Sequence, residues 1–299
     1  MAAFLAAALA LSNIGLVFDR IGAIPLRLLA LTTLFAALYL VFKGLQFYFF
    51  LRDIGLQPGW RDLTLAYAVG ELTLALPMGI YAQNYVLLRL EGSQPSRSAA
   101  ATTVMLLLEI AILFLTLAAV GVKGWPWVQP LAIASFFGLA GFVALVTRWN
   151  QLRRIIAKTL QHLKLSPRPY LHFVSSLDLL TGGHSLLRHG WLSVLYLAAL
   201  FAAFDAVAHG VGAPLTMHQS VSIYAFSLSA ALLFGSLTTQ VGLTEVAGMG
   251  AAHALGFDYT QGLAMLLGFR LVWTACIWLI CLPVVIALKS QLDQRSRPK

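Results

Sequence analysis

The stretch FGSLTTQVGLTEVAGMG, residues 234–250, decides how the chain must fold, because it interrupts an otherwise apolar sequence. Four glycines alternate there with polar side chains, namely Thr238, Thr239, Gln240, Thr244 and Glu245. Irregular backbone at membrane depth survives only where it is buried in protein or lines a cavity, because lipid offers no hydrogen-bond partners. The stretch therefore predicts a broken helix whose tip borders a polar cavity inside the membrane.

The composition of the 299-residue chain indicates a lipid environment. Hydrophobic residues make up 60% of it and charged residues only 10%, whereas soluble domains carry about a quarter charged residues. Its mean hydropathy is +0.83. Cys276 and Cys281 lie together in the last apolar run, so we expect neither a disulfide framework nor a zinc site and interpret both as small hydrophobic residues.

Six apolar segments approach the roughly 20 residues that a helix needs to cross the hydrocarbon. They are residues 2–18, 24–43, 98–122, 125–147, 191–212 and 262–288. No basic region precedes the first, so an uncleaved helix is favoured there over a signal peptide. Two further segments, 64–90 and 220–255, are apolar but interrupted by glycines and polar residues.

The placement of basic residues predicts which loops face the cytoplasm. Apart from the stretch 148–190, they gather at Lys43, Arg52, Arg61, Arg89, Arg97, Lys289, Arg295, Arg297 and Lys299. If all of these face the cytoplasm, segment 64–90 enters and leaves on that side, and segment 220–255 enters and leaves on the other. We therefore predict an all-α polytopic membrane protein with about six full spans, two re-entrant hairpins and both termini in the cytoplasm.

We predict a single integral membrane domain over residues 1–299. Three spans separate the hairpins and invert the second relative to the first, so the halves, about 1–122 and about 125–288, are expected to form an inverted repeat. Broken helices that meet near the midplane of such repeats form transport paths. Between the halves lies the basic cytoplasmic amphipathic segment, residues 148–190.

Residues 150–165 place leucines and isoleucines at helical spacing with basic residues opposite, which predicts a helix lying on the membrane surface. Its basic side chains are expected to contact anionic lipid headgroups through Arg148, Arg153, Arg154 and Lys158. Two roles stay open, an orientation anchor and a collector of anionic lipid substrate. No aromatic-rich surface for single strands accompanies it, so nucleic acid is not an expected partner.

Ionisable residues inside the apolar segments mark candidate functional positions, since a charge at mid-membrane costs about 2.5–3.5 kcal/mol. They are Glu71, Glu109, Asp205, Glu245 and Arg270. Arg270 is expected either to pair with Glu245 or Glu109, or to bind a lipid phosphate. Glu71 and Glu245 either stay neutral and donate hydrogen bonds, or handle a proton or a headgroup. His209 is interpreted as an ordinary end-of-helix residue rather than a proton relay.

Motifs for metal binding or catalysis are missing from the sequence. His162, His172, His184 and His189 lack metal-ligand spacing and are expected to be solvated. There is no Ser/His/Asp set, no phosphate-binding glycine loop and no pair of aspartates typical of metal-dependent group transfer. We therefore expect no metal, no cofactor and no enzymatic activity.

Two longer runs carry a family resemblance. They are ALPMGIYAQNYVLLRLEGSQPSRSAAATTVMLLLEIAI, residues 75–112, and VGLTEVAGMGAAHALGFDYTQGLAMLLGFR, residues 241–270. Both resemble the hairpins and following helices of the lysylphosphatidylglycerol synthase transmembrane, or flippase-like, family, and the similarity covers essentially the whole chain. The family motifs fall on Pro77, Gly79, Arg89, Gly242, Glu245, Gly256 and Arg270. The sequence departs from the family pattern at Met78, Ile80, Gln240 and Val241.

The resemblance implies a bacterial inner-membrane protein that moves, or helps to move, a lipid between leaflets. The family's aminoacyl-transferase domain is not expected, since nothing follows Lys299. The residues expected to contact the substrate are Glu71, Pro77, Gly79, Gln83, Asn84, Arg89, Glu109, Gln240, Gly242, Glu245 and Arg270.

Three functions follow as hypotheses. The leading one is a flippase for a phospholipid or a polyprenyl- or hopanoid-type lipid. The second is a non-transporting accessory subunit of a glycolipid or lipid-modification pathway, which the departures in the first motif favour. The third is a membrane-bound lipid-modifying transferase. The expected partners are membrane lipids and, for an accessory subunit, lipid-biosynthesis or glycosyltransferase proteins.

Overall fold

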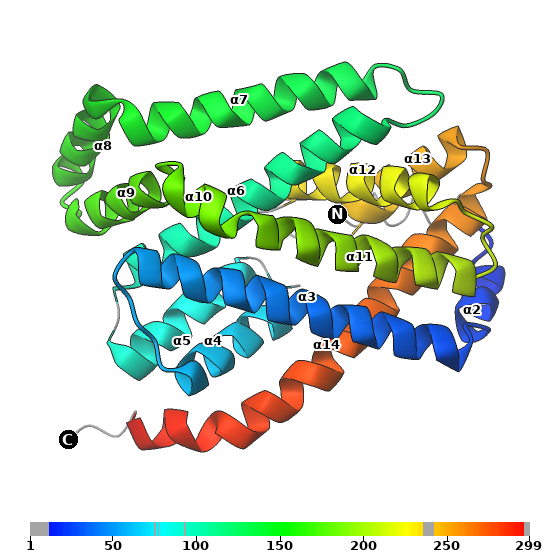
Figure 1. Cartoon of the computed structure of the whole chain (residues 1–299), viewed down its shortest axis with the longest axis horizontal. Helices are drawn as coiled ribbons and strands as arrows, with labels where there is room; N and C mark the ends of the chain where they lie inside the picture. The colour runs from blue at the N-terminus through cyan, green and yellow to red at the C-terminus, as the bar shows by residue number, and fades with distance from the viewer. Residues whose placement is uncertain (1–11, 75, 77, 93, 236–241, 296–299) are drawn as a thin grey trace.

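The computed structural model describes residues 12–74, 76, 78–92, 94–235 and 242–295, and all the regular structure in these ranges is helical (Figure 1). Five helices of the described part are long and apolar enough to cross a membrane. They are α3 (Leu26–Asp53), α6 (Pro95–Val120), α7 (Val128–Arg148), α11 (Trp191–Gly210) and α14 (Tyr259–Arg295). The protein is thus an all-α polytopic membrane protein, as the sequence predicted.

Four of the predicted spans, at 98–122, 125–147, 191–212 and 262–288, coincide closely with α6, α7, α11 and α14. Most of the predicted span 2–18 lies outside the described residues. Its last part belongs to the short helix α2 (Ile14–Gly22), whose first turn is capped by the Asn13 side chain accepting from the Leu16 amide.

The predicted end of the second span, residue 43, is wrong. Helix α3 continues to Asp53, and Lys43, which we had placed in a cytoplasmic loop, is only 5% exposed inside the helix. The positive-inside rule treats a lysine at the end of an apolar run as a loop marker. Here the lysine has acidic partners on other helices, so the helix continues through it.

Both interrupted segments fold back on themselves. Hairpin 1 consists of α4 (Trp60–Leu72), the 3₁₀ turn η1 (Gly79–Tyr81) and α5 (Ala82–Glu91), and α4 packs against α5. Hairpin 2 consists of α12 (Met217–Gly235) and α13 (Leu243–Ala254), which also pack against each other. Neither segment runs straight through the molecule, which agrees with the broken helices predicted from the sequence.

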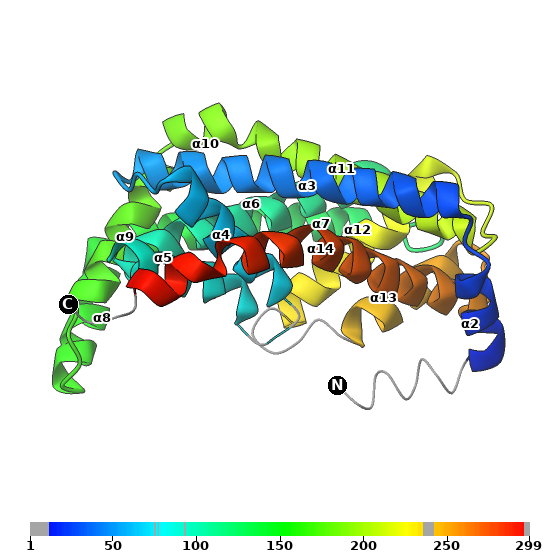
Figure 2. The ribbon, with the colours of Figure 1, turned by 90° about the horizontal axis from the view of Figure 1, so that it is seen from below.

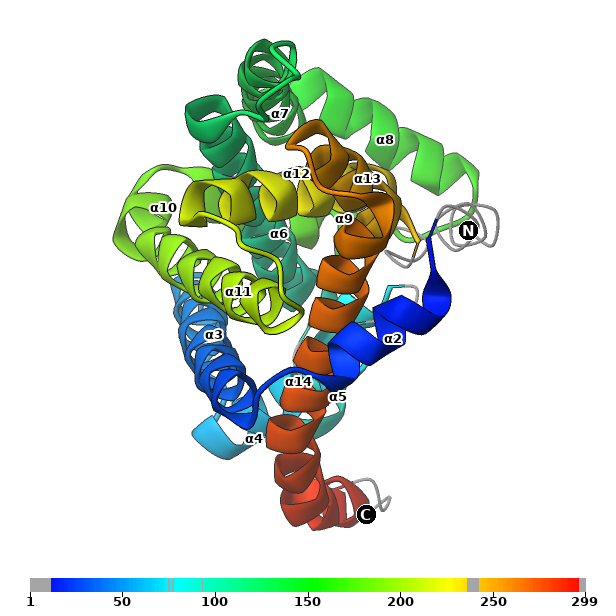
Figure 3. The same ribbon diagram turned by 90° about the vertical axis from the view of Figure 1, so that its right-hand side faces the viewer.

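The two hairpins lie toward opposite ends of the long axis, hairpin 1 near the C-terminal end of α3 and hairpin 2 near its N-terminal end (Figures 1 and 2). Helices α6 and α14 each contact both hairpins. Viewed along the long axis, α7 and α8 lie at the opposite edge of the molecule from α3 (Figure 3). The two hairpins are therefore held by a common pair of helices.

The basic segment 148–190 forms three helices at the end where hairpin 1 lies (Figure 1). They are α8 (Asn150–His162), α9 (Arg168–Thr181) and α10 (His184–His189). No residue of α8 is buried, as expected for a surface helix. His162, His172 and His184 are exposed as predicted, but the prediction was wrong for His189, which is 7% exposed.

The core is centred on α3 and α11, which pack along each other. Four of their aromatic side chains are completely buried, with Phe47 and Phe50 on α3 and Tyr196 and Phe204 on α11 each 0% exposed. Large rings packed at close density leave little freedom for relative movement of the two helices. This packing therefore holds α3 in place, and with it the side chains of Tyr39 and Lys43.

Candidate functional site

The tip of hairpin 1 is a turn that requires glycine at position 79. A Cβ atom on Gly79 would lie 1.7 Å from the carbonyl oxygen of Thr73. The Thr73 hydroxyl donates to the carbonyl oxygens of Val69 at 2.8 Å and Gly79 at 3.1 Å. These contacts tie the end of α4 to the tip of the hairpin. Met78 adopts a left-handed conformation with φ of 59°.

The tip of hairpin 2 is organised by Gly242 and Glu245. Gly242 has φ of 89°, a conformation that favours glycine, and directly precedes α13. Its amide donates to the Glu245 carboxylate at 2.7 Å. Glu245 occupies the first turn of α13, where the helix dipole favours negative charge. Thr238, Thr239 and Gln240, predicted to belong to this tip, lie outside the described residues.

Arg270 on α14 pairs with Glu245, as one of our two expectations for it predicted. The distance between Arg270 Nε and Glu245 Oε1 is 2.8 Å, and Glu245 is only 1% exposed. Removal of one partner of such a buried ion pair destabilises the folded protein by about 3–5 kcal/mol. The pair therefore fastens the tip of hairpin 2 to the helix beneath it.

A second group of charges gathers around Lys43, and we call Lys43, Glu71 and Glu109 the lysine–glutamate cluster. Lys43 Nζ lies 3.5 Å from Glu71 Oε1 on hairpin 1 and 4.0 Å from Glu109 Oε2 on α6. The ammonium also donates to the Tyr39 hydroxyl one turn earlier on α3. Each of the three charged residues is less than a tenth exposed. The cluster thus joins α3, α4 and α6.

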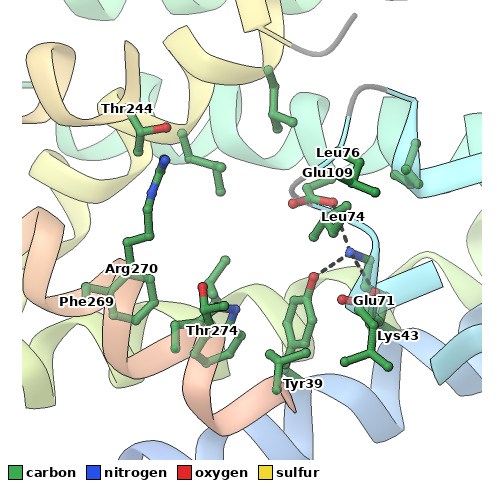
Figure 4. Close-up of a pocket in the computed structure, with 18 of the residues that line it drawn as sticks. Tyr39, Lys43, Glu71, Leu74, Leu76, Glu109, Thr244, Phe269, Arg270 and Thr274 are labelled. Carbon is green, nitrogen blue, oxygen red and sulfur yellow. Dashed lines mark hydrogen bonds and ion pairs between the residues drawn. The ribbon is translucent and has the colours of Figure 1, made fainter. Parts of the chain in front are cut away.

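A cavity of about 220 Å³ lies between the two charged groups. The tip of hairpin 1 lines it through Leu74, Met78 and Gly79, and hairpin 2 contributes Leu232 and Thr244. Figure 4 shows Arg270 reaching toward Thr244 on one side, with the lysine–glutamate cluster on the other. The wall between them is largely aromatic and aliphatic, with Tyr39, Leu106, Leu200, Tyr224, Leu266, Phe269, Trp273 and Ile277. The cavity is therefore charged at two poles and apolar between them.

Gln83 and Asn84 are buried beside this cavity but turn toward α6. Both side-chain amides donate to the Thr102 hydroxyl, Gln83 at 2.9 Å and Asn84 at 3.1 Å. Gln83 also borders a smaller space next to the lysine–glutamate cluster. These two residues therefore attach hairpin 1 to α6 rather than line the large cavity.

The structure brings together Glu71, Gly79, Glu109, Gly242, Glu245 and Arg270, but not every predicted site residue. Arg89 is exposed on α5 and donates to the Tyr85 hydroxyl at 2.6 Å and 2.9 Å. It does not appear among the residues lining the cavity. Pro77 and Gln240 lie outside the described residues. The structure thus places residues of the second family motif at the site, but it does not place Arg89 of the first motif there.

The basic side chains predicted to contact lipid headgroups also differ, since three of them are exposed and one is not. Arg148, Arg154 and Lys158 are exposed, but Arg153 is half-buried and lies 3.3 Å from Asp178 on α9. The apolar face of α8 is also open, with Ile155 59% exposed. The helix is thus attached to α9 on one side and free on its basic and apolar faces.

Asp205, the remaining intramembrane acid, is remote from the cavity lining. It accepts from the Ser220 hydroxyl at 2.5 Å and lies 3.5 Å from Nδ1 of His209, whose side chain is 46% exposed. These contacts connect the end of α11 to the start of α12. Asp205 therefore has a structural role, and His209 agrees with our interpretation of an end-of-helix residue.

His189 belongs to a polar group at the junction of α3, α10 and α11. Its Nε2 lies 3.4 Å from Asp53, and the carboxylate of Asp53 also accepts from Ser185. The ring stacks on Phe49 at a centroid distance of 4.7 Å. Burial lowers the pKa of His189 below its ordinary value, and the nearby Asp53 opposes this only in part. The imidazole therefore favours the neutral form.

Sequence analysis missed Lys43 and Tyr39 as site residues. The available signal was the run LFAALYLVFKGLQFYFFL, residues 34–51, in which Lys43 is the one charged residue of a largely apolar stretch. A charge in such a position usually faces the protein interior and has a partner. The same argument that selected Glu71 and Glu109 also applies to this lysine.

Comparison with known protein families identifies the family of the chain. The family model described as the lysylphosphatidylglycerol synthase TM region matches residues 1–281 of the chain. The chain belongs to this family. Membership in the lysylphosphatidylglycerol synthase TM family agrees with the resemblance of the two motif runs and with a multi-pass membrane protein. No curated protein matched the chain in a sequence comparison.

Proposed function

We propose that the protein moves a lipid with a phosphate-containing headgroup between the two leaflets of the bacterial inner membrane. The observation that carries this proposal is the cavity between the hairpin tips, with Arg270 at one pole and the lysine–glutamate cluster at the other. Pockets for small ligands are mostly apolar, with a few polar groups that fix orientation. Membership in a family of lipid-related membrane domains supports the same class of substrate.

In this proposal the headgroup enters the cavity and the tails stay in lipid. A guanidinium matches phosphate geometry with a planar fork, so Arg270 is the side chain suited to hold it. Exposed apolar residues at the edge of the cavity, Leu76, Met78 and Trp278, are 61%, 51% and 53% exposed. They offer the tails an apolar path beside the headgroup site.

The transport cycle would use the two hairpins as gates. They approach the cavity from opposite ends and share α6 and α14 as supports. We propose that the halves form an inverted repeat, and that the hairpin tips move against the fixed α3 and α11 pair to open the cavity to one leaflet at a time. The basic end with α8, α9 and α10 faces the cytoplasm in this scheme, together with both termini. The sequence has no ATP-binding motif, so the driving force would come from a gradient or from mass action.

A leaflet assay tests the proposal directly. Purified protein is reconstituted into liposomes that contain a fluorescent phospholipid, and a membrane-impermeant quencher reports how much of it changes leaflet. We expect Arg270→Ala to reduce the rate of lipid movement at least tenfold. A loss of about 1.4 kcal/mol of phosphate-binding free energy already lowers the affinity for the headgroup tenfold. Arg89→Ala is the matched control, since it removes an exposed arginine outside the cavity. Equal rates for wild type and both variants would remove the assignment of Arg270.

An accessory role is the second candidate. Met78 and Ile80 place apolar side chains on the cavity wall where the family pattern often has charged ones. A protein weakened in this way would fail to move lipid alone and would do so only with a co-purified partner. A transferase would instead change the mass of the lipid, so mass spectrometry of the same liposomes separates these outcomes.

A further inference from the structure

We propose that the lysine–glutamate cluster is a proton-binding site, with Glu109 as the group that takes up the proton. The cluster holds two carboxylates and one ammonium, all less than a tenth exposed. When all three groups are ionised its formal charge is −1, and one added proton makes it neutral. An uncompensated charge in a low-dielectric interior is costly, and two carboxylates that share one site oppose each other's ionisation.

The distances assign the proton to Glu109. Lys43 Nζ is nearer to Glu71, at 3.5 Å, than to Glu109, at 4.0 Å. Since the attraction between opposite charges increases at shorter distance, Lys43 interacts more strongly with Glu71 than with Glu109. Glu109 receives less of that stabilisation and is therefore the better proton acceptor.

Among the side chains that the structure describes, the other groups around the cluster do not supply a further positive charge to Glu109. Tyr39 on α3, Tyr67 on α4 and Tyr196 on α11 surround Lys43 and the two glutamates, and Tyr224 on α12 and Cys281 on α14 lie nearby. All five are neutral in their protonated forms. Arg270, the other cation lining the cavity, is paired with Glu245 at the opposite pole.

A small space next to the cluster is suited to one water molecule, which would relay the proton. A second cavity of about 10 Å³ is lined by Lys43, Glu71 and Glu109 together with Gln83 and Thr102. This volume is near the roughly 10–15 Å³ that one water molecule needs, and the lining offers the polar partners that a buried water requires. Gln83 belongs to hairpin 1, which lies at the basic end of the molecule, so the exchange would occur with the cytoplasmic side of the proposed orientation.

The proton site also connects to the lipid site, a step that rests on the proposed function. A phosphate bound at Arg270 adds negative charge to a cavity whose opposite pole already carries a net negative charge. Protonation of Glu109 reduces the repulsion, so proton binding and phosphate binding strengthen each other, and by linkage each does so by the same factor. A transmembrane pH difference would then bias the movement of lipid.

Infrared difference spectroscopy tests the proton site without any transport. Purified protein in nanodiscs is titrated with acid, and the C=O stretch of a protonated carboxyl group is followed. We expect a band that is lost in Glu109→Gln and retained in Glu245→Gln, the matched control at the other pole. Glu109→Asp keeps a carboxyl group and should shift the band rather than remove it. Absence of the band in the wild type, or its survival in a folded Glu109→Gln protein, overturns the proposal.

Two further measurements separate this proposal from the proposed function. Addition of short-chain phosphatidic acid to the nanodisc protein in weak buffer should raise the pH through proton uptake, and Glu109→Gln should abolish that change. In liposomes, a difference of about one pH unit should alter the equilibrium lipid distribution about tenfold if one proton moves with each lipid. A protein with the infrared band and no lipid movement keeps the proton site and contradicts the flippase. Lipid movement that ignores the pH difference contradicts the coupling.

Discussion

At the scale of single residues, Lys43 shows that a lysine at the end of an apolar run can either mark a loop or lie buried inside a helix. Helix α3 continues through the lysine because Glu71 and Glu109 come from two other helices to meet it. Their positions in the sequence alone do not show that they converge on α3. The acids could be predicted as functional because each is surrounded by apolar neighbours, but the partner of each depends on packing between distant helices.

The glycine at the tip of hairpin 1 gives a prediction on stability. We expect Gly79→Ala to lower the free energy of unfolding by at least about 1–3 kcal/mol, the usual cost of overpacking. The physical reason is the 1.7 Å approach of the added Cβ atom to the Thr73 carbonyl oxygen. Thermal unfolding in detergent measures the effect.

Gly141→Ala is the control for this substitution. It lies on α7, and a Cβ atom added there meets nothing within 4 Å. Alanine is favoured over glycine inside a helix by about 0.5–1 kcal/mol, so this variant should be as stable as the wild type or slightly more stable. Equal melting temperatures for the two variants would show that the tip is looser than the structure indicates.

His189 gives a prediction on pH dependence. Burial lowers its folded-state pKa below the ordinary histidine value of 6.5, so the unfolded chain binds a proton at a higher pH than the folded protein does. Stability therefore falls as the pH drops through 6.5 toward the lower folded-state value, and this contribution stops changing below it. We expect the melting temperature of His189→Gln to fall less than that of the wild type between about pH 7.5 and about pH 5.

The exposed His162 provides the comparison for that experiment. Its replacement by glutamine removes a histidine from the same basic segment without touching Asp53 or Phe49. The pH profile of this variant should follow the wild type. If His162→Gln and His189→Gln flatten the profile equally, the effect belongs to overall charge and not to the buried imidazole.

At the scale of helices, much of the architecture could be predicted because long apolar runs have few alternatives in a membrane. Both interrupted segments were predicted to fold back, and the structure pairs α4 with α5 and α12 with α13. The extension of α3 to Asp53 was missed because Lys43 was interpreted as the end of the apolar run, although the run continues to Leu51. The position of Arg89 could not be predicted, because a motif gives spacing along the chain and not the direction in which a side chain points.

Cysteine accessibility tests the two hairpins as elements. Gln57→Cys and Gln94→Cys flank hairpin 1, whereas Thr216→Cys and Asp258→Cys flank hairpin 2, and all four positions are exposed. In right-side-out and inverted vesicles, an impermeant thiol reagent should label the first two from one face and the last two from the other. The native Cys276 and Cys281 are buried and serve as the unlabelled background. Labelling of Gln57→Cys and Gln94→Cys from opposite faces would mean that hairpin 1 crosses the membrane.

At the scale of the whole molecule, the basic helices lie at one end, and this gives a prediction on contact with lipids. The exposed Arg154 and Lys158 of α8 lie at the same end as hairpin 1. A basic residue near an anionic surface contributes about 1 kcal/mol. We expect the double variant Arg154→Gln with Lys158→Gln to retain fewer anionic lipids during purification, as measured by lipid mass spectrometry. Lys123→Gln, an exposed lysine between α6 and α7, is the control and should leave lipid retention unchanged.

The ion pair between Arg270 and Glu245 has a consequence for the proposed transport cycle. With its carboxylate only 2.8 Å away, the guanidinium is already neutralised and has little need of a stray anion from the surroundings. A phosphate that arrives there has to displace one anion with another, and when it departs the carboxylate returns to its place. Such a swap keeps the resting site closed to small ions and makes binding weak enough for release on the far side, which is what a carrier requires and a storage site does not.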